Sequence, residues 1–206
     1  MTRVREGVVS VVLVNFRGVD DTLRAVEELG ALDWPAARLE VVVVENASGD
    51  DSLERLRTLG SRITLVESRE NLGFAGGCNL GVSRSSGEYV ALLNNDARPH
   101  PHWIAEAVAA FDSNPKIGAV ASKVLDWDGR RVDFVDASVT WYGMGFKPFV
   151  GEVYRDSHEE SRNVLFGTGA AMFVRRAVFD ALGGFDERYF MFFEDVDLGW
   201  RLNHAG

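Results

Sequence analysis

The chain has 206 residues, 46% of them hydrophobic, which is enough for one large domain with a buried core. It carries 22 Lys and Arg against 31 Asp and Glu, and the net charge of -9 disfavours nonspecific attraction to nucleic acid or anionic lipid. The single cysteine, Cys78, excludes an internal disulfide and suits a reducing cytosol, and no apolar segment approaches the roughly 18 residues of a membrane span.

Runs of β-branched residues alternate with helical patterns through the first part of the chain. We expect strands at 8–14, 39–44, 63–66, 89–93 and 117–124, with helices at 20–32, 51–59 and 102–111 between them. Asp20 or Asp21 can cap the first helix, and Ser48, Asp50 and Asp51 can cap the second. This alternation predicts a mostly parallel sheet of an α/β protein.

A glycine-rich segment, 71–87, precedes the strand at 89–93. Its five glycines disfavour a helix, since each costs about 1 kcal/mol relative to alanine, and they suggest close approach of the backbone to a partner. A phosphate-binding loop is one interpretation. The glycine order does not match the G-x-G-x-x-G fingerprint, so the segment argues against a nicotinamide or flavin enzyme.

The strand at 89–93 ends in Asn94, Asn95, Asp96 and then Pro99. In open α/β sheets ligands bind beyond the carboxyl ends of the strands, so Asp96 is placed to hold a divalent cation and, through it, phosphate oxygens. Such a cation would also offset the negative charge of the chain toward an anionic substrate. The alternative is that these three residues form only a turn.

The pattern changes after Leu125. Residues 126–143 indicate a hairpin around Asp128 and Gly129, and 144–163 is irregular, as expected of a mobile loop over a site. A strand at 170–174 and a short helix ending at Leu182 complete this part.

The last predicted helix starts near Glu194, directly after the aromatic segment 189–193, and its first turn contains Glu194, Asp195 and Asp197. A structural explanation exists, because the helix dipole stabilises these acids and Asp197 can pair with Arg201. The functional alternative is that apolar surroundings tune Asp195 for proton transfer. The aromatic residues are either core or the wall of a site.

Five segments in this order resemble the family 2 glycosyltransferases, in particular the bacterial branch with rhamnosyltransferases of cell-wall and polysaccharide precursors. They read VVLVNF, VVVVENASGDDS, NLGFAGGCNLG, EYVALLNNDARP, and GTGAAMFVRR with GGFDERYFMFFEDVDLGWR. The resemblance implies the GT-A fold, a Rossmann-like, mostly parallel sheet with helices on both faces and a small hairpin on the acceptor side. It implies one domain over 1–206, with a nucleotide-binding half (1–124) and an acceptor-side half (125–206), as the N-terminal part of a longer protein.

The resemblance also implies an inverting, metal-dependent transfer of a sugar from a nucleoside diphosphate sugar to a hydroxyl group. Asp195 matches the catalytic base, and Asp96 matches the family's ligand of manganese or magnesium. The residues implied to bind or line the site of the nucleotide sugar are Asn15, Phe16, Glu45, Asn46, Ser48, Asp50, Asn71, Gly73, Phe74, Asn79, Asn95, Gly167, Thr168, Gly169 and Glu194.

The sequence departs from the family pattern at three places. The DxD motif reads Asn94, Asn95, Asp96, which leaves one carboxylate and implies weak metal affinity. Glu45 replaces the more usual aspartate. A further histidine ligand that family members often have is missing, because we expect His204 to lie on the surface of the last helix.

By resemblance, the donor is linked to thymidine or uridine diphosphate, and the acceptor is a saccharide or lipid-linked saccharide. We expect no nucleic-acid partner, no transmembrane segment and a cytoplasmic location, with a lipid-linked acceptor bringing the enzyme to the inner face of the membrane. The alternative function is a nucleotide-sugar-binding fragment without turnover.

Overall fold

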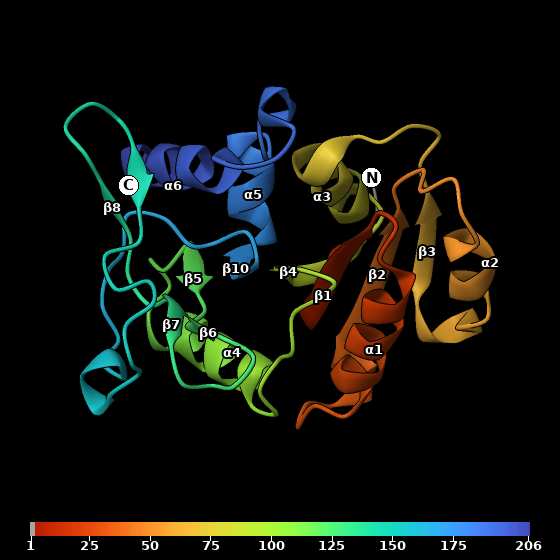
Figure 1. The fold of residues 1–206 in the computed structure, drawn as a ribbon, viewed down its shortest axis with the longest axis horizontal. Helices are drawn as coiled ribbons and strands as arrows, with labels where there is room; N and C mark the ends of the chain where they lie inside the picture. The colour runs from red at the N-terminus through yellow and green to blue at the C-terminus, as the bar shows by residue number, and fades with distance from the viewer. Residues whose placement is uncertain (1–2) are drawn as a thin grey trace.

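In the computed structural model, which describes residues 3–206, six strands form one mixed sheet in the order β3-β2-β1-β4-β10-β5 (Figure 1). The four parallel strands are β1 (Arg5–Asn15), β2 (Leu39–Glu45), β3 (Thr64–Glu67) and β4 (Gly87–Leu93). Strand β10 (Ala171–Arg175) runs antiparallel to β4, and β5 (Ala119–Ala121) runs antiparallel to β10. The predicted α/β class and mostly parallel sheet are confirmed.

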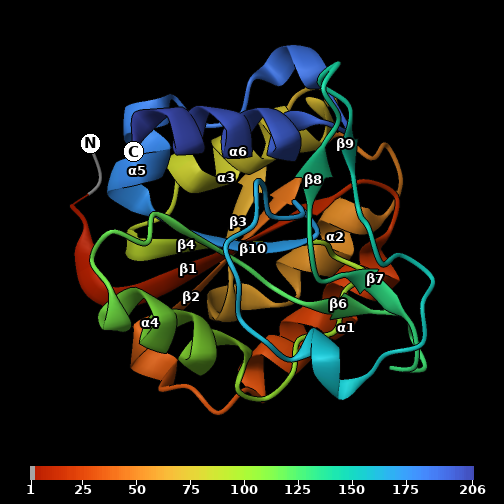
Figure 2. The same ribbon diagram turned by 90° about the vertical axis from the view of Figure 1, so that its left-hand side faces the viewer.

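Helices cover both faces of the sheet (Figures 1 and 2). One face carries α1 (Val19–Gly30), α2 (Ser52–Arg57) and α4 (Trp103–Ser113), and the other carries α3 (Gly73–Ser83), α5 (Arg176–Leu182) and α6 (Glu194–Ala205). Alternate residues of β1 enter different cores: Val11 joins the first and Val12 the second, and both are fully buried. This explains why the central strands are continuously apolar rather than alternating.

The glycine-rich segment forms helix α3, so the prediction that its glycines disfavour a helix was wrong. The close approach that they suggested is real, but its partner is the sheet. A Cβ on Gly77 would lie 2.8 Å from Val14 Cγ1, and one on Gly81 would overlap the Val12 side chain. The helix therefore lies closer to β1 than a helix with larger residues could, and the phosphate-loop interpretation is wrong.

Two further expectations need correction. Helix α1 has Gly18 as its N-cap, and Asp20 and Asp21 lie inside the first turn, where they interact favourably with the helix dipole instead of capping it. The strand expected at 117–124 is two strands, because the chain changes partner near Ser122: β5 pairs with β10, and β6 (Val124–Leu125) pairs with β7 (Val132–Phe134).

The caps expected for α2 are partly right. Asp51 occupies the N-cap without a side-chain cap bond, and the carboxylate of Asp50 accepts a hydrogen bond from Ser52 N at 2.9 Å.

Two small two-stranded sheets lie outside the main sheet. The β6–β7 pair is the hairpin expected around Asp128 and Gly129, and β8 (Ser138–Val139) pairs with β9 (Gly145–Phe146). Short 3-10 turns are η1 (Ala36–Arg38), η2 (Gly60–Arg62), η3 (Asp156–His158) and η4 (Glu187–Tyr189). Strand β5 lies before the proposed division at residue 124 and strand β10 lies after it, so both halves contribute to one sheet.

Within residues 3–206, no helix has the length and apolarity to cross a membrane.

We predict that Gly81→Ala lowers the free energy of unfolding by about 1–3 kcal/mol, because its Cβ would overpack against Val12 and Val44, both fully buried. The matched control is Gly30→Ala at the exposed end of α1, where a Cβ would meet nothing within 4 Å. Urea unfolding measures both variants. Equal stabilities would contradict the proposed contact between α3 and the sheet.

Candidate functional site

Two hydrogen bonds, each donated by a main-chain N–H group, join the end of β4 to the start of α6. Asn94 N donates to Ala170 O at 2.9 Å, and Gly169 N donates to Asp195 Oδ2 at 2.9 Å. Asp96, two residues after Asn94, has an exposed side chain, and the Asp195 side chain is half-buried. The two acids that lie far apart in the sequence are thus held at the same edge of the sheet.

Several predicted donor-binding side chains are bonded to one another beneath the surface. Asn15 is fully buried, and it donates to Ser48 Oγ at 3.2 Å and accepts from Thr22 Oγ1 at 2.8 Å. Asn95 donates to Thr22 Oγ1 at 3.0 Å and to Gly18 O at 3.2 Å. These amides fix the tip of β1 relative to the tip of β4, so their direct role in this structure is to support the site.

The acid that ends β2 has a similar supporting role. Glu45 is buried, and its carboxylate accepts hydrogen bonds from Ser48 N at 2.8 Å and Ala47 N at 3.2 Å. The next residue, Asn46, donates to Asn71 Oδ1 and to Gly73 O, both at 3.0 Å. The loop after β2 is therefore bonded to the segment that precedes α3.

The N-terminus of α3 is closed by the segment before α6. Phe190 O accepts hydrogen bonds from Phe74 N at 2.7 Å and from Ala75 N at 3.2 Å, which satisfies free N–H groups of the helix. Gly73 has φ of +70°, and a Cβ there would overlap Phe190. A glycine is needed here for both the backbone conformation and the close contact.

The aromatic segment 189–193 is strained and exposed. Phe190, Phe192 and Phe193 have φ of 58°, 72° and 68°, a region that non-glycine residues rarely adopt. The side chains of Tyr189, Phe190, Phe192 and Phe193 are 41–72% exposed, so the core interpretation of this segment was wrong. The structure is compatible with the alternative, the wall of a site.

The two neighbouring acids at the start of α6 differ in how deeply their side chains are buried. Glu194 is only 5% exposed, and its Oε2 has no hydrogen-bond partner within residues 3–206. Burial, with a smaller contribution from the negative charge of Asp195, raises the pKa of Glu194 to about 7. We expected Asp195 to lie in buried surroundings, but the buried acid is Glu194. A contact between Glu194 and the donor would require this carboxylate to become exposed.

The side chains of the other predicted residues differ in exposure. Thr168 and Gly169 are buried, and Gly167, Phe74 and Asn79 are half-buried. Asn79 binds the loop before the aromatic segment, donating to Phe185 O and accepting from Phe185 N, both at 2.9 Å. The exposed members of the set are Phe16, Asp50, Asn71 and Asp96. His204 is exposed on α6, and Asp197 pairs with Arg201 at 2.6 Å, as expected.

Trp127, which the sequence analysis did not single out, lies beside the predicted metal ligand. It lines a narrow groove together with Asn95, Asp96 and Arg98, and the Arg98 guanidinium lies 5.4 Å from the centre of its ring. From the sequence, a tryptophan at the tip of a hairpin can be expected to be exposed. Only the fold shows that it lies beside the end of β4.

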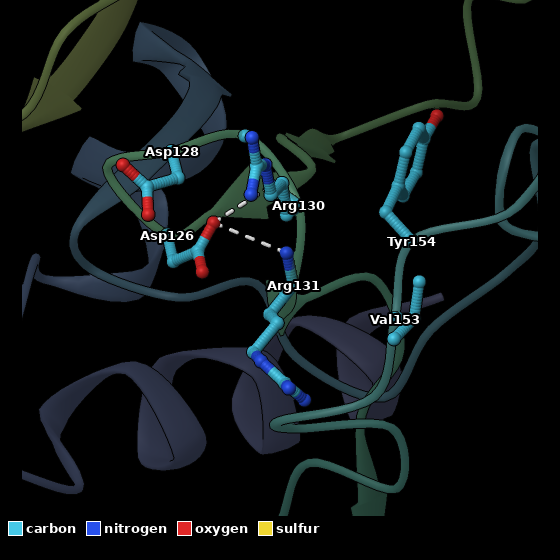
Figure 3. Close-up of a pocket in the computed structure, with 7 residues that line it drawn as sticks. Asp126, Asp128, Arg130, Arg131, Val153 and Tyr154 are labelled. Carbon is cyan, nitrogen blue, oxygen red and sulfur yellow. Dashed lines mark hydrogen bonds between the residues drawn. The ribbon is translucent and has the colours of Figure 1, made fainter.

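A surface pocket lies between this hairpin and the segment that contains Val153 and Tyr154 (Figure 3). It has a volume of about 470 Å³, and its lining includes Asp126, Arg130 and Tyr154. Asp126 is occupied by hydrogen bonds from the N–H groups of Arg130 and Arg131 at 2.8 and 3.1 Å. None of the predicted site residues lines this pocket, so its size does not identify the site.

The residues present fit a weakly held metal ion. Within residues 3–206, no group of three or more His, Cys, Asp and Glu side chains is arranged to hold a metal by itself. Asp96 supplies one exposed carboxylate at a strand tip. This suits Mg²⁺ or Mn²⁺ sites in which one or two carboxylates share the ion with substrate phosphates and water.

Comparison with known proteins finds one matching family model and several relatives. The sequence model described as Glycosyl transferase family 2 matches residues 10–183. The chain is 31% identical to the O-antigen biosynthesis protein RfbC of Myxococcus xanthus over 204 residues, which cover 95% of this chain and 16% of RfbC. It is 28% identical over 190 residues to the N-acetylglucosaminyl-diphospho-decaprenol L-rhamnosyltransferase of Mycobacterium tuberculosis, covering 82% of this chain and 62% of the relative.

The chain thus spans less than two thirds of the length of either relative. Among solved structures, it is similar to the mannosyltransferase PcManGT of Pyrobaculum calidifontis in complex with GDP-Man and Mn²⁺. The TM-score is 0.71 at 21% identity, and the match covers 96% of this chain and 52% of that chain. This similarity supports the fold.

We predict that Glu194→Gln becomes increasingly stabilising, relative to the wild type, as pH rises from about 4.5 to about 7. In that window the folded wild type keeps a proton on Glu194 that the unfolded chain has lost, so its stability falls as pH rises; the glutamine variant has no such group. The difference should reach about 1–3 kcal/mol. Denaturant unfolding between pH 4 and 8 measures it, and a pH-independent difference would contradict the raised pKa.

Proposed function

Because the chain belongs to glycosyl transferase family 2 and has the GT-A fold, we propose that it transfers a sugar from a nucleoside diphosphate sugar to a hydroxyl group of a saccharide acceptor. The observation that supports this proposal is that hydrogen bonds at Asn94, Ala170 and Gly169 join the end of β4, near Asp96, to Asp195 at the start of α6. The reaction needs a cation site and a base on the two sides of one sugar.

Asp195 is the proposed base. The hydrogen bond from Gly169 N, and another from Val196 N at 2.8 Å, fix the orientation of its carboxylate. Each carboxylate oxygen has a second acceptor position, so the group can still receive the proton of an attacking hydroxyl. The oxygen attacks the anomeric carbon as the bond to the diphosphate breaks, which inverts the configuration in one step. A positioned base contributes about 10²- to 10⁴-fold in rate.

Asp96 is the proposed ligand of a divalent cation. When bound, Mn²⁺ or Mg²⁺ acts as a Lewis acid that stabilises the charge developing on the leaving diphosphate. Around this position, Asn95 supports the strand tip and Trp127 lines the adjacent groove. The nucleoside is proposed to bind along the ends of β1 and β2, where Phe16, Asp50 and Asn71 are exposed.

The acceptor is proposed to be a lipid-linked saccharide in polysaccharide synthesis. The Mycobacterium tuberculosis relative is named as an L-rhamnosyltransferase acting on N-acetylglucosaminyl-diphospho-decaprenol, and the other relative is an O-antigen biosynthesis protein. We propose that the donor carries thymidine or uridine diphosphate, that residues 125–206 contact the acceptor, and that the protein works in the cytoplasm at the inner membrane face.

We predict that Asp195→Asn lowers kcat by about 10²- to 10⁴-fold while the Kd for the nucleoside diphosphate stays within about twofold. The asparagine can keep the bond from Gly169 N but cannot act as the base. Radiolabelled sugar transfer and calorimetry measure the two quantities. The control is Asp197→Asn on the same helix, which removes the ion pair with Arg201. Full activity in the Asp195 variant would rule out its assignment as the base; binding without turnover in the wild type would favour the binding-fragment alternative.

We predict that nucleoside diphosphates raise the melting temperature of the wild type more strongly with Mn²⁺ than with EDTA. Asp96→Asn should abolish this difference, because the amide is a poor ligand for a hard cation. Thermal-shift titration with UDP, dTDP and GDP makes the measurement. Asp180→Asn, at an exposed position of α5, serves as the control. If Mn²⁺ still increases the rise in melting temperature of the Asp96 variant, the metal is bound by other residues.

A further inference from the structure

The carboxyl group of Glu194 is enclosed by residues from two other parts of the chain. A Cβ on Gly169 would lie 3.3 Å from Glu194 Oε1 and 3.0 Å from Phe74 Cε1, so the acid lies between the glycine turn before β10 and the N-terminal part of α3. Burial, together with the negative charge of Glu194, raises the pKa of the Cys78 thiol on the same helix. The Glu194 and Cys78 side chains are 5% and 1% exposed.

Burial is the largest cause of the raised pKa of Glu194, the negative charge of Asp195 adds to it, and hydrogen bonding to the main chain at Glu194 and Phe192 opposes it only in part. On α3, the Cys78 thiol has a raised pKa itself and so carries no charge. One carboxylate oxygen, Oε2, is buried with no hydrogen-bond partner within the part of the chain that the structure describes. A buried carboxylate with an unpaired oxygen costs more free energy than a buried neutral acid.

We propose that Glu194 is a positioning residue that functions as a neutral carboxylic acid beside the proposed base, Asp195. This inference rests on the proposed function. A neutral Glu194 lets the segment 189–194 stay folded against Phe74 and Gly169, and this packing places Asp195. It also keeps a second negative charge away from the diphosphate of the donor.

The proton balance of the transfer then involves Asp195 alone. The hydroxyl proton of the acceptor moves to Asp195, the electron pair of that O–H bond forms the new bond to the anomeric carbon, and the leaving diphosphate keeps the electron pair of the broken bond. Glu194 stays protonated throughout. After the product leaves, Asp195 releases the proton to solvent.

The consequence is a loss of activity as Glu194 ionises. Its negative charge would then repel the donor and destabilise the segment that places Asp195, so kcat/KM of the wild type should fall at least about threefold as the pH rises through about 7. Glutamine has the shape of the neutral acid and cannot ionise. Glu194→Gln should therefore lower kcat/KM by less than about tenfold at pH 6 and remove the alkaline decline.

The experiment combines pH–rate profiles with ¹³C NMR of labelled glutamate carboxyl groups in the full chain. One carboxyl signal should titrate near pH 7 and be absent from Glu194→Gln, whereas Glu194→Asp should retain an alkaline decline in kcat/KM. Circular dichroism confirms that the variants fold. A Glu194 signal that titrates below about pH 5, or a glutamine variant that loses activity more than about 100-fold at every pH, would overturn the inference.

The NMR titration also separates this inference from the proposed function. If Glu194 titrates near pH 7 and the wild type transfers no sugar from any donor tested, the proposed function fails and the neutral state of Glu194 is established. If transfer occurs and Glu194 titrates as an ordinary glutamate, the proposed function stands and the inference fails.

Discussion

The candidate site depends on the hydrogen bond that Gly169 N donates to the carboxylate of Asp195. Gly169 lies two residues before the start of β10, and Ala170, between them, accepts a hydrogen bond from Asn94 at the end of β4. A late segment of the chain is thereby fixed to the central strand that ends near Asp96. The antiparallel insertion of β10 between β4 and β5 makes this possible, because the start of β10 then lies beside the end of β4.

The strained segment before α6 is the second constraint. Three phenylalanines with positive φ would each be unfavourable in isolation, by about 1–3 kcal/mol. They are held by the bonds from Phe74 N and Ala75 N to Phe190 O, at the N-terminus of a helix that its glycines bring close to the sheet. Backbone strain of this kind persists only where the surrounding contacts hold the backbone in place. Here the strained residues immediately precede Glu194 and Asp195. The geometry of the acids therefore depends on the packing of α3.

Much of the fold could be predicted from the sequence, because β-branched runs specify the buried strands and acids mark the first turn of α6. Helix α3 could not, since glycine propensity is a local quantity and the contact of Gly81 with Val12 is a tertiary one. In the site, the motif order located Asp96 and Asp195. It could not show that the side chains of Asn15 and Glu45 form hydrogen bonds within the protein. Nor could it show that the buried acid is Glu194 rather than Asp195. The sequence also could not show that Trp127 lies beside Asp96, because this depends on how the β6–β7 hairpin packs against the end of β4.

The most direct test of the account is a crystal structure of the chain with Mn²⁺ and the nucleoside diphosphate sugar that binds most tightly. The account predicts the metal within about 2.0–2.3 Å of an Asp96 oxygen and the Asp195 carboxylate on the opposite side of the same sugar ring. A nucleotide bound in the pocket formed by Asp126, Arg130 and Tyr154, or a sugar that only one of the two acids can reach, would contradict it.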